Sequence, residues 1–540
     1  MYAQLEDTIG EQLERTRLTG LTIALIRRDE VVWAKGYGLA DLASGATMEP
    51  DTVCGIMSVT KPIVGTAVTQ LRDAGMFALD DPVNPYLTPV SIKNQWEAES
   101  PVTIRQLLTH TAGMPVNIGL DPPGRHELAE YVDLAAKTSW RPGSAMVYAN
   151  WGYAALGLLI ERCSGRSVGE YFRDEILAPL GMDKTIYGQP EGPHANGHFV
   201  SLVDRTVHAL PMDEWPVIPT SPAGGCWSTA MDLAEFLQAH IGDGTGILAP
   251  DSVREMQEVS ARQGAAPDGM GLGFRVTRSN GRELVCHGGD GGGFTAFAGF
   301  HPEDGVGVAL LINTAGMQVA RSVIANTALE VLLDSTSRKG VAVQGIRPGL
   351  YRTNFWDVVA EVEDDPPAID VSEGLVVLDE VCESRLVALE GGGVEGEGGM
   401  FHGFEVTLTG GDEPGISGGV YPFAFTRVGD IPEVEPIDEN ADLSGAWSGT
   451  VQTPMAPLAI TLTIGEANTA TVTTPFGTTD VLNLGAHSGK MVGEFPLSFP
   501  GVGDFTNFLR LEARGGRLTG MTHARSQFGE NAMRTELARV

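Results

Sequence analysis

The segment SVTKPIVGTAVTQLRDAG, residues 58–75, joins a serine and a lysine three positions apart to the pattern of an amphipathic helix. Its apolar residues recur at helical spacing: Ile63, Val64, Ala67, Val68 and Leu71. Because residues three apart share a helix face, we expect the Lys61 amine beside the Ser58 hydroxyl, near a helix N-terminus that favours developing negative charge. A desolvated lysine there can take the hydroxyl proton and make Ser58 nucleophilic. The simpler interpretation is a capping serine and a solvated lysine, so the assignment depends on the rest of the chain.

A second motif is Tyr148-Ala149-Asn150, which lies between the turn-forming residues WRPGSA and the helical pattern WGYAALGLLIERCSG. A tyrosine in such a loop can direct its hydroxyl into a cleft, where its phenolate, stabilised by lysine, relays a proton. The simpler interpretation is that Asn150 caps the helix and Tyr148 packs on the surface. The capping and catalytic roles are compatible with each other.

The third motif is His287-Gly288-Gly289, which follows the predicted strand ELVC and precedes the glycine-rich turn DGGGF. Glycines allow a substrate to approach the backbone closely, so that amide groups can bind an oxyanion. Cys286 adjoins the motif, but neighbouring strand residues point to opposite faces, and we predict a buried cysteine rather than a thiol nucleophile. His110 is predicted to serve the end of a helix rather than catalysis.

The patterns around these motifs predict an α+β fold. Residues 21–38 form two β-rich runs around a polar turn, strands return at 271–313, and a last helix covers about 316–334. The helical patterns between them lie at 102–110, 151–163 and 229–240. We therefore expect an antiparallel sheet whose strands come from both ends of the segment, with helices in between.

Beyond residue 335 the chain changes to short alternating runs without helical periodicity, which predict two small antiparallel β-barrel domains. The expected partition is 1–335, 349–430 and 441–540. Residues 490–506, KMVGEFPLSFPGVGDFT, are rich in Pro and Gly and are predicted to form a loop rather than paired strands.

The bulk composition excludes several kinds of partner. The formal net charge of -33 repels nucleic acid and anionic membrane surfaces. No apolar run reaches the length of about 18 residues expected of a membrane span, and no signal-peptide pattern is visible, so a cytoplasmic location is expected. Five widely spaced cysteines without metal-ligand spacing predict reduced thiols and no metal site.

The three motifs together resemble those of the penicillin-recognising serine hydrolases, in the branch of class C β-lactamases and D-aminopeptidases. The segments TIRQLLTHTAGM at 103–114 and PAGGCWSTAMDLAEF at 222–236 add to a resemblance that covers about residues 5–335. It implies a β-lactamase-like catalytic domain in which Ser58 is acylated and Lys61 and Tyr148 share the proton transfers. It also implies substrate binding by Asn150, His287, Gly289 and Asp290, with the backbone amides of Ser58 and Asp290 as the oxyanion hole.

One departure from the resemblance bears on the substrate. β-Lactamases carry Lys-Thr/Ser-Gly at the third motif, whereas this chain has His287, which is only partly protonated near neutral pH. The motif is closer to that of D-aminopeptidases and esterases of the family, and the three-part length is most similar to the D-aminopeptidase. In that enzyme a loop of the last β-domain reaches the cleft, so residues 490–506 are expected to do the same.

These observations predict a serine hydrolase that needs no cofactor and cleaves a small amide or peptide through an acyl-enzyme. An aminopeptidase or amidase is favoured, with D-amino-acid specificity as one option. The alternatives are a carboxylesterase of the same family and a non-catalytic penicillin-binding or sensor protein. The expected partner is a small amide, peptide or ester, and a homodimer is left open.

Overall fold

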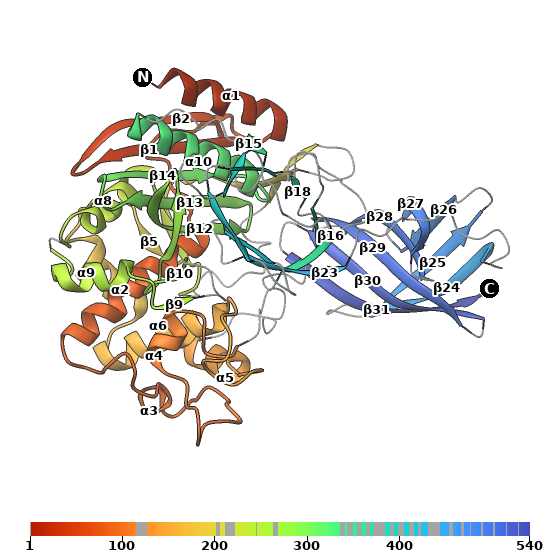
Figure 1. Ribbon diagram of the computed structural model, residues 1–540, viewed down its shortest axis with the longest axis horizontal. Coiled ribbons are helices and arrows are strands. Elements are labelled where there is room, and N and C mark those ends of the chain that lie inside the picture. The colour runs from red at the N-terminus through yellow and green to blue at the C-terminus, as the bar shows by residue number, and fades with distance from the viewer. Residues whose placement is uncertain are drawn as a thin grey trace.

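The computed structural model in Figure 1 describes residues 2–114, 127–200, 206–210, 222–244, 246–262 and 268–334. After these it describes mainly the strands between residues 341 and 540.

A nine-stranded antiparallel sheet forms the centre of the N-terminal part, in the order β3-β2-β1-β14-β13-β12-β11-β10-β9. Strand β1 pairs with β2 on one side and with β14 on the other, with Ala24 opposite both Ala34 and Ala309. The two ends of this part of the chain therefore meet inside one sheet, which confirms the predicted α+β plan. The strands are β1 (Gly20–Arg27), β2 (Glu30–Asp41), β3 (Ala46–Thr47), β9 (Ala261–Arg262), β10 (Gly269–Met270), β11 (Arg275–Ser279), β12 (Arg282–Gly291), β13 (Phe294–His301) and β14 (Val306–Ile312).

Helices cover both faces of this sheet (Figure 1). Helices α1 (Ala3–Thr16) and α10 (Gln318–Leu333) pack on one face, and α2 (Thr60–Asp73), α6 (Asn150–Ser164) and α8 (Ala230–Ile241) lie on the other side. Strand alternation separates two apolar cores: Leu21, Ile23 and Leu25 belong to the core beside α10, and Ala24 and Ile26 to the opposite one.

The N-terminal part also contains shorter helices and strands. They are the 3₁₀ turn η1 (Met57–Val59), α3 (Asn84–Leu87), α4 (Ile104–Leu108), α5 (Leu128–Ala135), α7 (Val168–Phe172), the π-helical turn η2 (Arg173–Leu177), α9 (Pro250–Gln257), β4 (Cys54–Gly55), β5 (Ile186–Tyr187), β6 (Gly197–Val200), β7 (Val207–Leu210) and β8 (Cys226–Ser228). The helix expected from residue 58 thus begins as a 3₁₀ turn and becomes α-helical at Thr60.

The C-terminal part consists of antiparallel strands, as expected. In the first sheet the order is β15-β19-β18-β17-β16-β23-β22-β21-β20, and an added pairing of β19 with β20 closes the strands from β16 to β23 into a ring. Its strands are β15 (Val341–Ala342), β16 (Gly349–Thr353), β17 (Val359–Val362), β18 (Ala368–Asp370), β19 (Ser384–Ala388), β20 (Val394–Glu397), β21 (Glu405–Thr409), β22 (Gly415–Gly418) and β23 (Phe423–Gly429).

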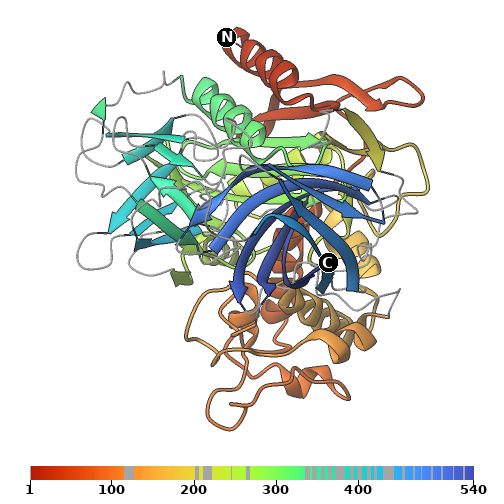
Figure 2. The same ribbon diagram turned by 90° about the vertical axis from the view of Figure 1, so that its right-hand side faces the viewer.

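The last eight strands form a closed barrel with its own apolar core. Figure 1 shows it at the end of the molecule away from the central sheet, and Figure 2 views the molecule from that end. Its strands are β24 (Gly445–Gln452), β25 (Pro457–Ile464), β26 (Ala470–Thr474), β27 (Gly477–His487), β28 (Lys490–Phe499), β29 (Gly503–Arg514), β30 (Arg517–Ser526) and β31 (Gly529–Arg539). The partition into residues 1–335, 349–430 and 441–540 stays a prediction.

The predicted loop at residues 490–506 is wrong where the structure describes this segment, and residues 500–502 lie outside the described residues. Strand β28 pairs with β29 from Met491 to Phe499. Pro496 fits in this strand because β28 pairs with β27 only as far as Glu494, so beyond that residue one edge of β28 needs no N–H donor. The expectation that these residues close the cleft as a loop loses its basis.

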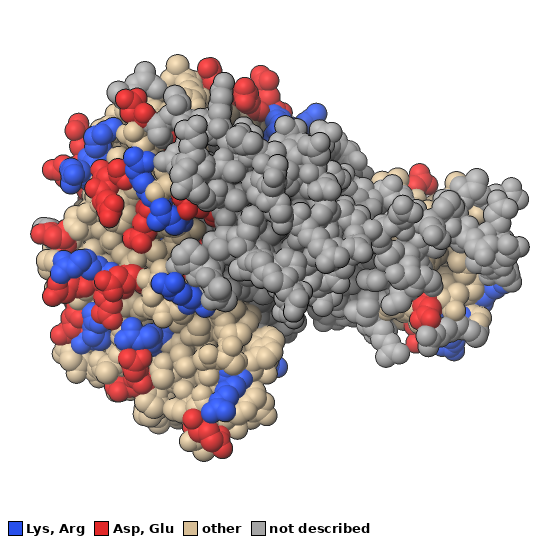
Figure 3. Space-filling view, in the orientation of Figure 1, with Lys and Arg blue, Asp and Glu red and all other residues tan. Residues whose placement is uncertain are grey.

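Acidic and basic side chains are interspersed on the described surface around the central sheet (Figure 3). Among the described residues, no helix combines the length and the apolar character that crossing a membrane requires.

Candidate active site

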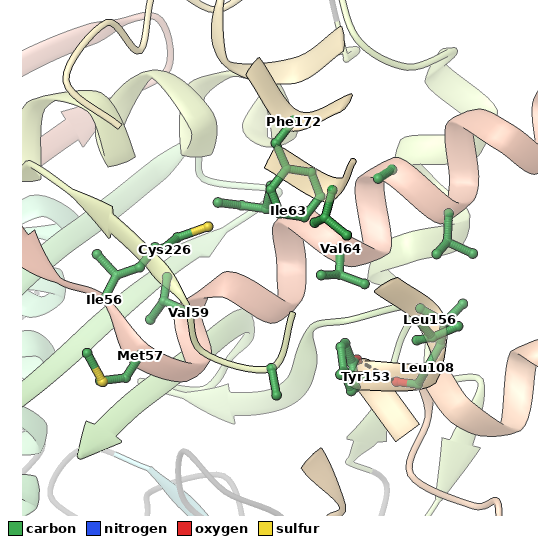
Figure 4. Close-up of a cluster of buried hydrophobic side chains, with 14 of the residues drawn as sticks. Ile56, Met57, Val59, Ile63, Val64, Leu108, Tyr153, Leu156, Phe172 and Cys226 are labelled. Carbon is green, nitrogen blue, oxygen red and sulfur yellow. Dashed lines mark hydrogen bonds between the residues drawn. The ribbon is translucent and has the colours of Figure 1, made fainter. Parts of the chain in front are cut away.

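Ser58 lies in a tight turn between β4 and α2. Met57, directly before it, has a φ of 49°, a left-handed conformation that non-glycine residues rarely adopt. The turn is held from both sides, since the Val59 amide donates to the Ile56 carbonyl and the Ile56 amide donates to the Cys226 carbonyl. Figure 4 shows Ile56, Met57 and Val59 around this turn, with Cys226 on the neighbouring strand. Ser58 is partly exposed, whereas its neighbours Met57 and Val59 are buried.

Lys61 is fully buried, and its amine has three polar neighbours. Its Nζ lies 3.0 Å from Ser58 Oγ, 2.9 Å from Asn150 Oδ1 and 2.8 Å from the Ala223 carbonyl oxygen. Burial holds the pKa of Lys61 well below its usual value, which favours the neutral amine. A neutral amine has two N–H groups and one lone pair. Since Asn150 Oδ1 and the Ala223 carbonyl can only accept, the lone pair is left for the Ser58 hydroxyl.

Tyr148 lies beside the same amine. The centre of its ring is 4.7 Å from Lys61 Nζ, and Ser58 lies close enough to the phenol to affect its pKa. Burial raises the pKa of Tyr148, and the nearby Ser58 hydroxyl partly opposes that rise. The tyrosine is therefore a neutral phenol at neutral pH, able to exchange a proton with Ser58. The surface location considered for Tyr148 is excluded, because the side chain is buried.

Asn150 does not cap α6. The cap position is Ala149, which makes no side-chain capping bond, and Asn150 is the first residue of the helix. Its carbonyl oxygen instead accepts from Lys61. The capping interpretation of Asn150 is thus wrong, because Asn150 lies inside the helix and its Oδ1 accepts from the lysine.

His110 supports this loop, in accordance with its predicted structural role. It follows the end of α4 with a φ of 58°, its carbonyl accepts from the Val147 amide at 2.8 Å, and its Nδ1 accepts from the Ala149 amide at 3.2 Å. Its ring centre is 4.3 Å from that of Tyr148. The sequence indicated the helix end, but it carried no sign of the contact with Tyr148.

The third motif lies on β12, next to the Ser58 turn. A Cβ atom on Gly289 would lie 2.2 Å from the Ile56 carbonyl oxygen, so only glycine allows the two segments to approach this closely. His287 is buried, with its ring centre 6.3 Å from that of Tyr148. Burial is the main cause that lowers the pKa of His287, to about 3. This histidine is therefore neutral, and its Nδ1–H donates to the Gly288 carbonyl at 2.6 Å.

Asp290 points away from the serine. Successive strand residues alternate between faces, so the Asp290 carboxylate lies on the α10 side, where Oδ2 is 2.5 Å from Arg321 Nη1. Sequence reasoning missed this partner, and it assigned no role to the Ala223 carbonyl. An arginine in the apolar pattern of residues 316–334 was the available signal for Arg321, because arginine is rarely buried without a partner.

The thiols and the acidic groups offer no second site in the described residues. Four of the cysteines are described and all four are free thiols, and Cys286 is buried in β12, as predicted. Burial raises the pKa of its thiol to about 12, which keeps it protonated and unreactive. No group of three or more His, Cys, Asp or Glu side chains in this part of the chain is arranged to hold a metal ion.

Comparison with known proteins places this geometry in context. The family model described as Beta-lactamase matches residues 5–332. Penicillin-binding protein 4 of Amycolatopsis lactamdurans is 31% identical over 294 residues, which cover 51% of this chain and 76% of that protein. The chain also spans 62% of the length of Protein flp from Staphylococcus aureus, at 24% identity.

Two solved structures show the same fold. The D-amino acid amidase from Ochrobactrum anthropi SV3 is 25% identical, with a TM-score of 0.51 over 62% of this chain and 98% of that one. The octameric penicillin-binding protein homologue from Pyrococcus abyssi, at 24% identity, has a TM-score of 0.56 over 78% of this chain and 99% of that one.

Proposed function

Because the chain belongs to the β-lactamase family of serine hydrolases, we propose that it hydrolyses small amide or peptide substrates through an acyl-enzyme on Ser58. The observation that carries the proposal is the buried amine of Lys61, which has two acceptors for its N–H groups and Ser58 Oγ 3.0 Å from its nitrogen.

The first half of the reaction forms the acyl-enzyme. Lys61 accepts the hydroxyl proton while Ser58 Oγ attacks the substrate carbonyl carbon, and the carbonyl oxygen becomes an oxyanion. The backbone amides of Ser58 and Asp290 are the proposed donors to that oxyanion. When the tetrahedral intermediate collapses, the proton passes from Lys61, directly or through Tyr148, to the leaving nitrogen. An amine leaves, and Ser58 carries an ester.

The second half consumes water. The same pair removes a proton from a water molecule, which attacks the ester carbon, and Ser58 regains its proton as the acid departs. Asn150 and Gly289 border the space in which this chemistry occurs and are the proposed contacts to the substrate amide.

An open-chain amide is favoured over a β-lactam, because the third motif has no positive charge that could bind the carboxylate of a β-lactam antibiotic. With the pKa of His287 at about 3, this residue offers no positive charge to a substrate carboxylate between pH 5 and 8. The similarity to a D-amino acid amidase supports the amidase form of the proposal and D-amino-acid amides as the substrate class. A carboxylesterase is the second candidate, because the same serine, lysine and tyrosine serve an ester whose leaving group needs less proton transfer.

The test compares p-nitroanilides of D- and L-phenylalanine with p-nitrophenyl butyrate, on the wild-type protein and on Ser58→Ala. We expect D-anilide hydrolysis in the wild type, and a loss of at least about 10⁴-fold in kcat for Ser58→Ala, since the bond-forming atom is removed. Ser44→Ala, in the exposed turn between β2 and β3, is the matched control and should retain full activity.

The outcomes separate the candidates. Turnover of the ester without either anilide would favour the esterase. A fluorophosphonate that labels Ser58 without turnover of any substrate in a broad panel would favour a binding or sensor protein. Activity that survives in Ser58→Ala would refute the proposal.

A further inference from the structure

Arg321 is a buried cation for which the proposed reaction has no direct use. It lies on α10 with 1% of its side chain exposed, among the buried apolar residues Ala320, Ile324 and Ala325. Its Nη1 is 2.5 Å from Asp290 Oδ2, whose side chain is 16% exposed. A buried guanidinium is costly unless it is paired, so this ion pair fixes the two side chains relative to each other.

The ion pair lies at the end of β12, where three consecutive glycines follow and few side chains restrain the backbone. Asp290 is the last residue with a side chain before Gly291, Gly292 and Gly293, whose φ values are 136°, 52° and 84°. Glycines have wide conformational freedom. The carboxylate is therefore the last side-chain anchor of β12 before the turn.

The same stretch of backbone runs past the nucleophile. Gly289 contacts the Ile56 carbonyl, and a Cβ atom on Gly291 would lie 3.9 Å from the sulfur of Met57. The Asp290 amide between them is thus next to the Ser58 turn, while the Asp290 side chain is held from the opposite face by Arg321.

We propose that Arg321 is a positioning residue that fixes the Asp290 amide in the oxyanion hole through its ion pair with the Asp290 carboxylate. This inference rests on the proposed function, because it assigns the amide a role in the acylation of Ser58. Arg321 touches no reacting atom. It affects the rate indirectly, because it positions the end of β12.

Three variants test the proposal: Arg321→Met, Asp290→Asn and the double variant. Active sites are titrated with a fluorophosphonate, so that kcat is expressed per competent serine and any unfolded fraction drops out. We expect each single variant to lower kcat per site by about 10- to 100-fold with little change in KM, since loss of an oxyanion donor costs about 10²–10³-fold. The affinity for phenylboronic acid, which forms a tetrahedral adduct with serine, should weaken by a similar factor.

The direction in which each single variant changes kcat separates a positioning effect from an electrostatic effect. Arg321→Met leaves a negative charge and Asp290→Asn leaves a positive charge behind the oxyanion hole. A purely electrostatic effect would slow the first and accelerate the second, whereas loss of position slows both. Acceleration by Asp290→Asn would therefore overturn the proposal.

The matched control is Arg275→Met, which breaks another buried arginine–aspartate pair, with Asp268, on β11 of the same sheet. It should lower stability but leave kcat per site within about threefold, because that pair does not anchor the end of β12. Wild-type kinetics per site in Arg321→Met and Asp290→Asn would overturn the positioning role alone. Failure of the wild-type protein to be labelled at Ser58 would overturn this inference and the proposed function together.

Discussion

At the scale of single residues, burial decides the chemistry of the cleft. In water a lysine is a cation at neutral pH and a histidine is partly protonated, and burial lowers the pKa of both Lys61 and His287. Of the two, Lys61 is the one whose nitrogen lies against Ser58 Oγ, and its two N–H groups have other acceptors, so its lone pair is left for that hydroxyl. The same desolvation thus gives one residue the function of a base and deprives the other of a charge that could bind a carboxylate.

The pH dependence of the reaction follows from the lowered pKa of Lys61. The base is the neutral amine, so kcat/KM should rise with pH through the folded-state pKa of Lys61 and stay high above it. Lys61→Met should remove this limb and lower kcat by about 10²–10⁴-fold. Stability should follow the same direction, since the unfolded lysine still binds a proton up to its usual pKa, so unfolding is favoured at the lower pH.

The measurement is a kcat/KM profile from pH 5 to 10 with a melting curve at each pH. Lys35→Met is the control, because Lys35 is exposed and pairs with Glu6, so its loss should leave the profile unchanged. If kcat/KM of Lys61→Met still rises with pH in the same range, a group other than Lys61 is responsible for the rise.

At the scale of elements, the site depends on the contact between β12 and the turn before α2. The two segments lie more than 200 residues apart and meet where a glycine removes the side chain from between them. The rigid turn and the edge of the strand together define the position of Ser58 relative to the amides of the third motif.

Gly289→Ala tests this contact. The added methyl group would lie 2.2 Å from the Ile56 carbonyl oxygen, which forces β12 and the turn apart. We expect kcat to fall at least about tenfold, and stability to fall by about 1–3 kcal/mol, the usual cost of overpacking. Gly10→Ala, on α1 with no atom within 4 Å of the new methyl group, is the control. It should leave activity unchanged and raise stability by about 0.5–1 kcal/mol.

Fluorescence-monitored urea unfolding and steady-state kinetics measure both effects. Equal behaviour of the two variants would show that β12 and the Ser58 turn can separate without consequence.

At the scale of the whole molecule, a residue from the C-terminal part contributes to the apolar core of the β-lactamase-like part. Phe404, which directly precedes β21, is fully buried in the core beside α10, and its backbone bridges to Ser279 at the end of β11. Glu405 forms an ion pair with Arg278 at 2.8 Å. The sheet that follows residue 340 therefore supplies a side chain to the core beside α10.

Phe404→Ala should destabilise that core by about 3–5 kcal/mol, because a large buried side chain leaves a cavity. Acylation of Ser58 per folded molecule should stay at the wild-type level, since Phe404 lies on the face of the sheet opposite to the nucleophile. Leu482→Ala in β27 is the control, as that side chain is 48% exposed, and its effect should stay within about 0.5 kcal/mol. A wild-type melting temperature for Phe404→Ala would show that the two parts are independent.

The sequence by itself determined the features that depend on local spacing. Ser58 and Lys61 meet because three residues bring side chains to one helix face, and Cys286 is buried because β12 alternates. The antiparallel plan around the hairpin at 21–38 was equally readable, as were the all-β C-terminal strands. The serine–lysine pair, the alternation of β12 and the hairpin depend on residues close in the chain, where helical and strand geometry leaves few choices. The α+β plan came from the order of the predicted elements instead, since β1 pairs with the distant strand β14.

Tertiary structure alone decided the contacts between distant segments. The Ala223 carbonyl on Lys61, the Arg321 partner of Asp290 and the insertion of Phe404 join residues with no sequence pattern in common. Asn150 was mistaken for a helix cap, because the lysine that takes its side chain lies 89 positions away. Residues 490–506 were mistaken for a loop, because Pro496 is acceptable in a strand only where one edge is unpaired. Which edge of a strand has a neighbour is a property of the folded chain, and no local pattern contains it.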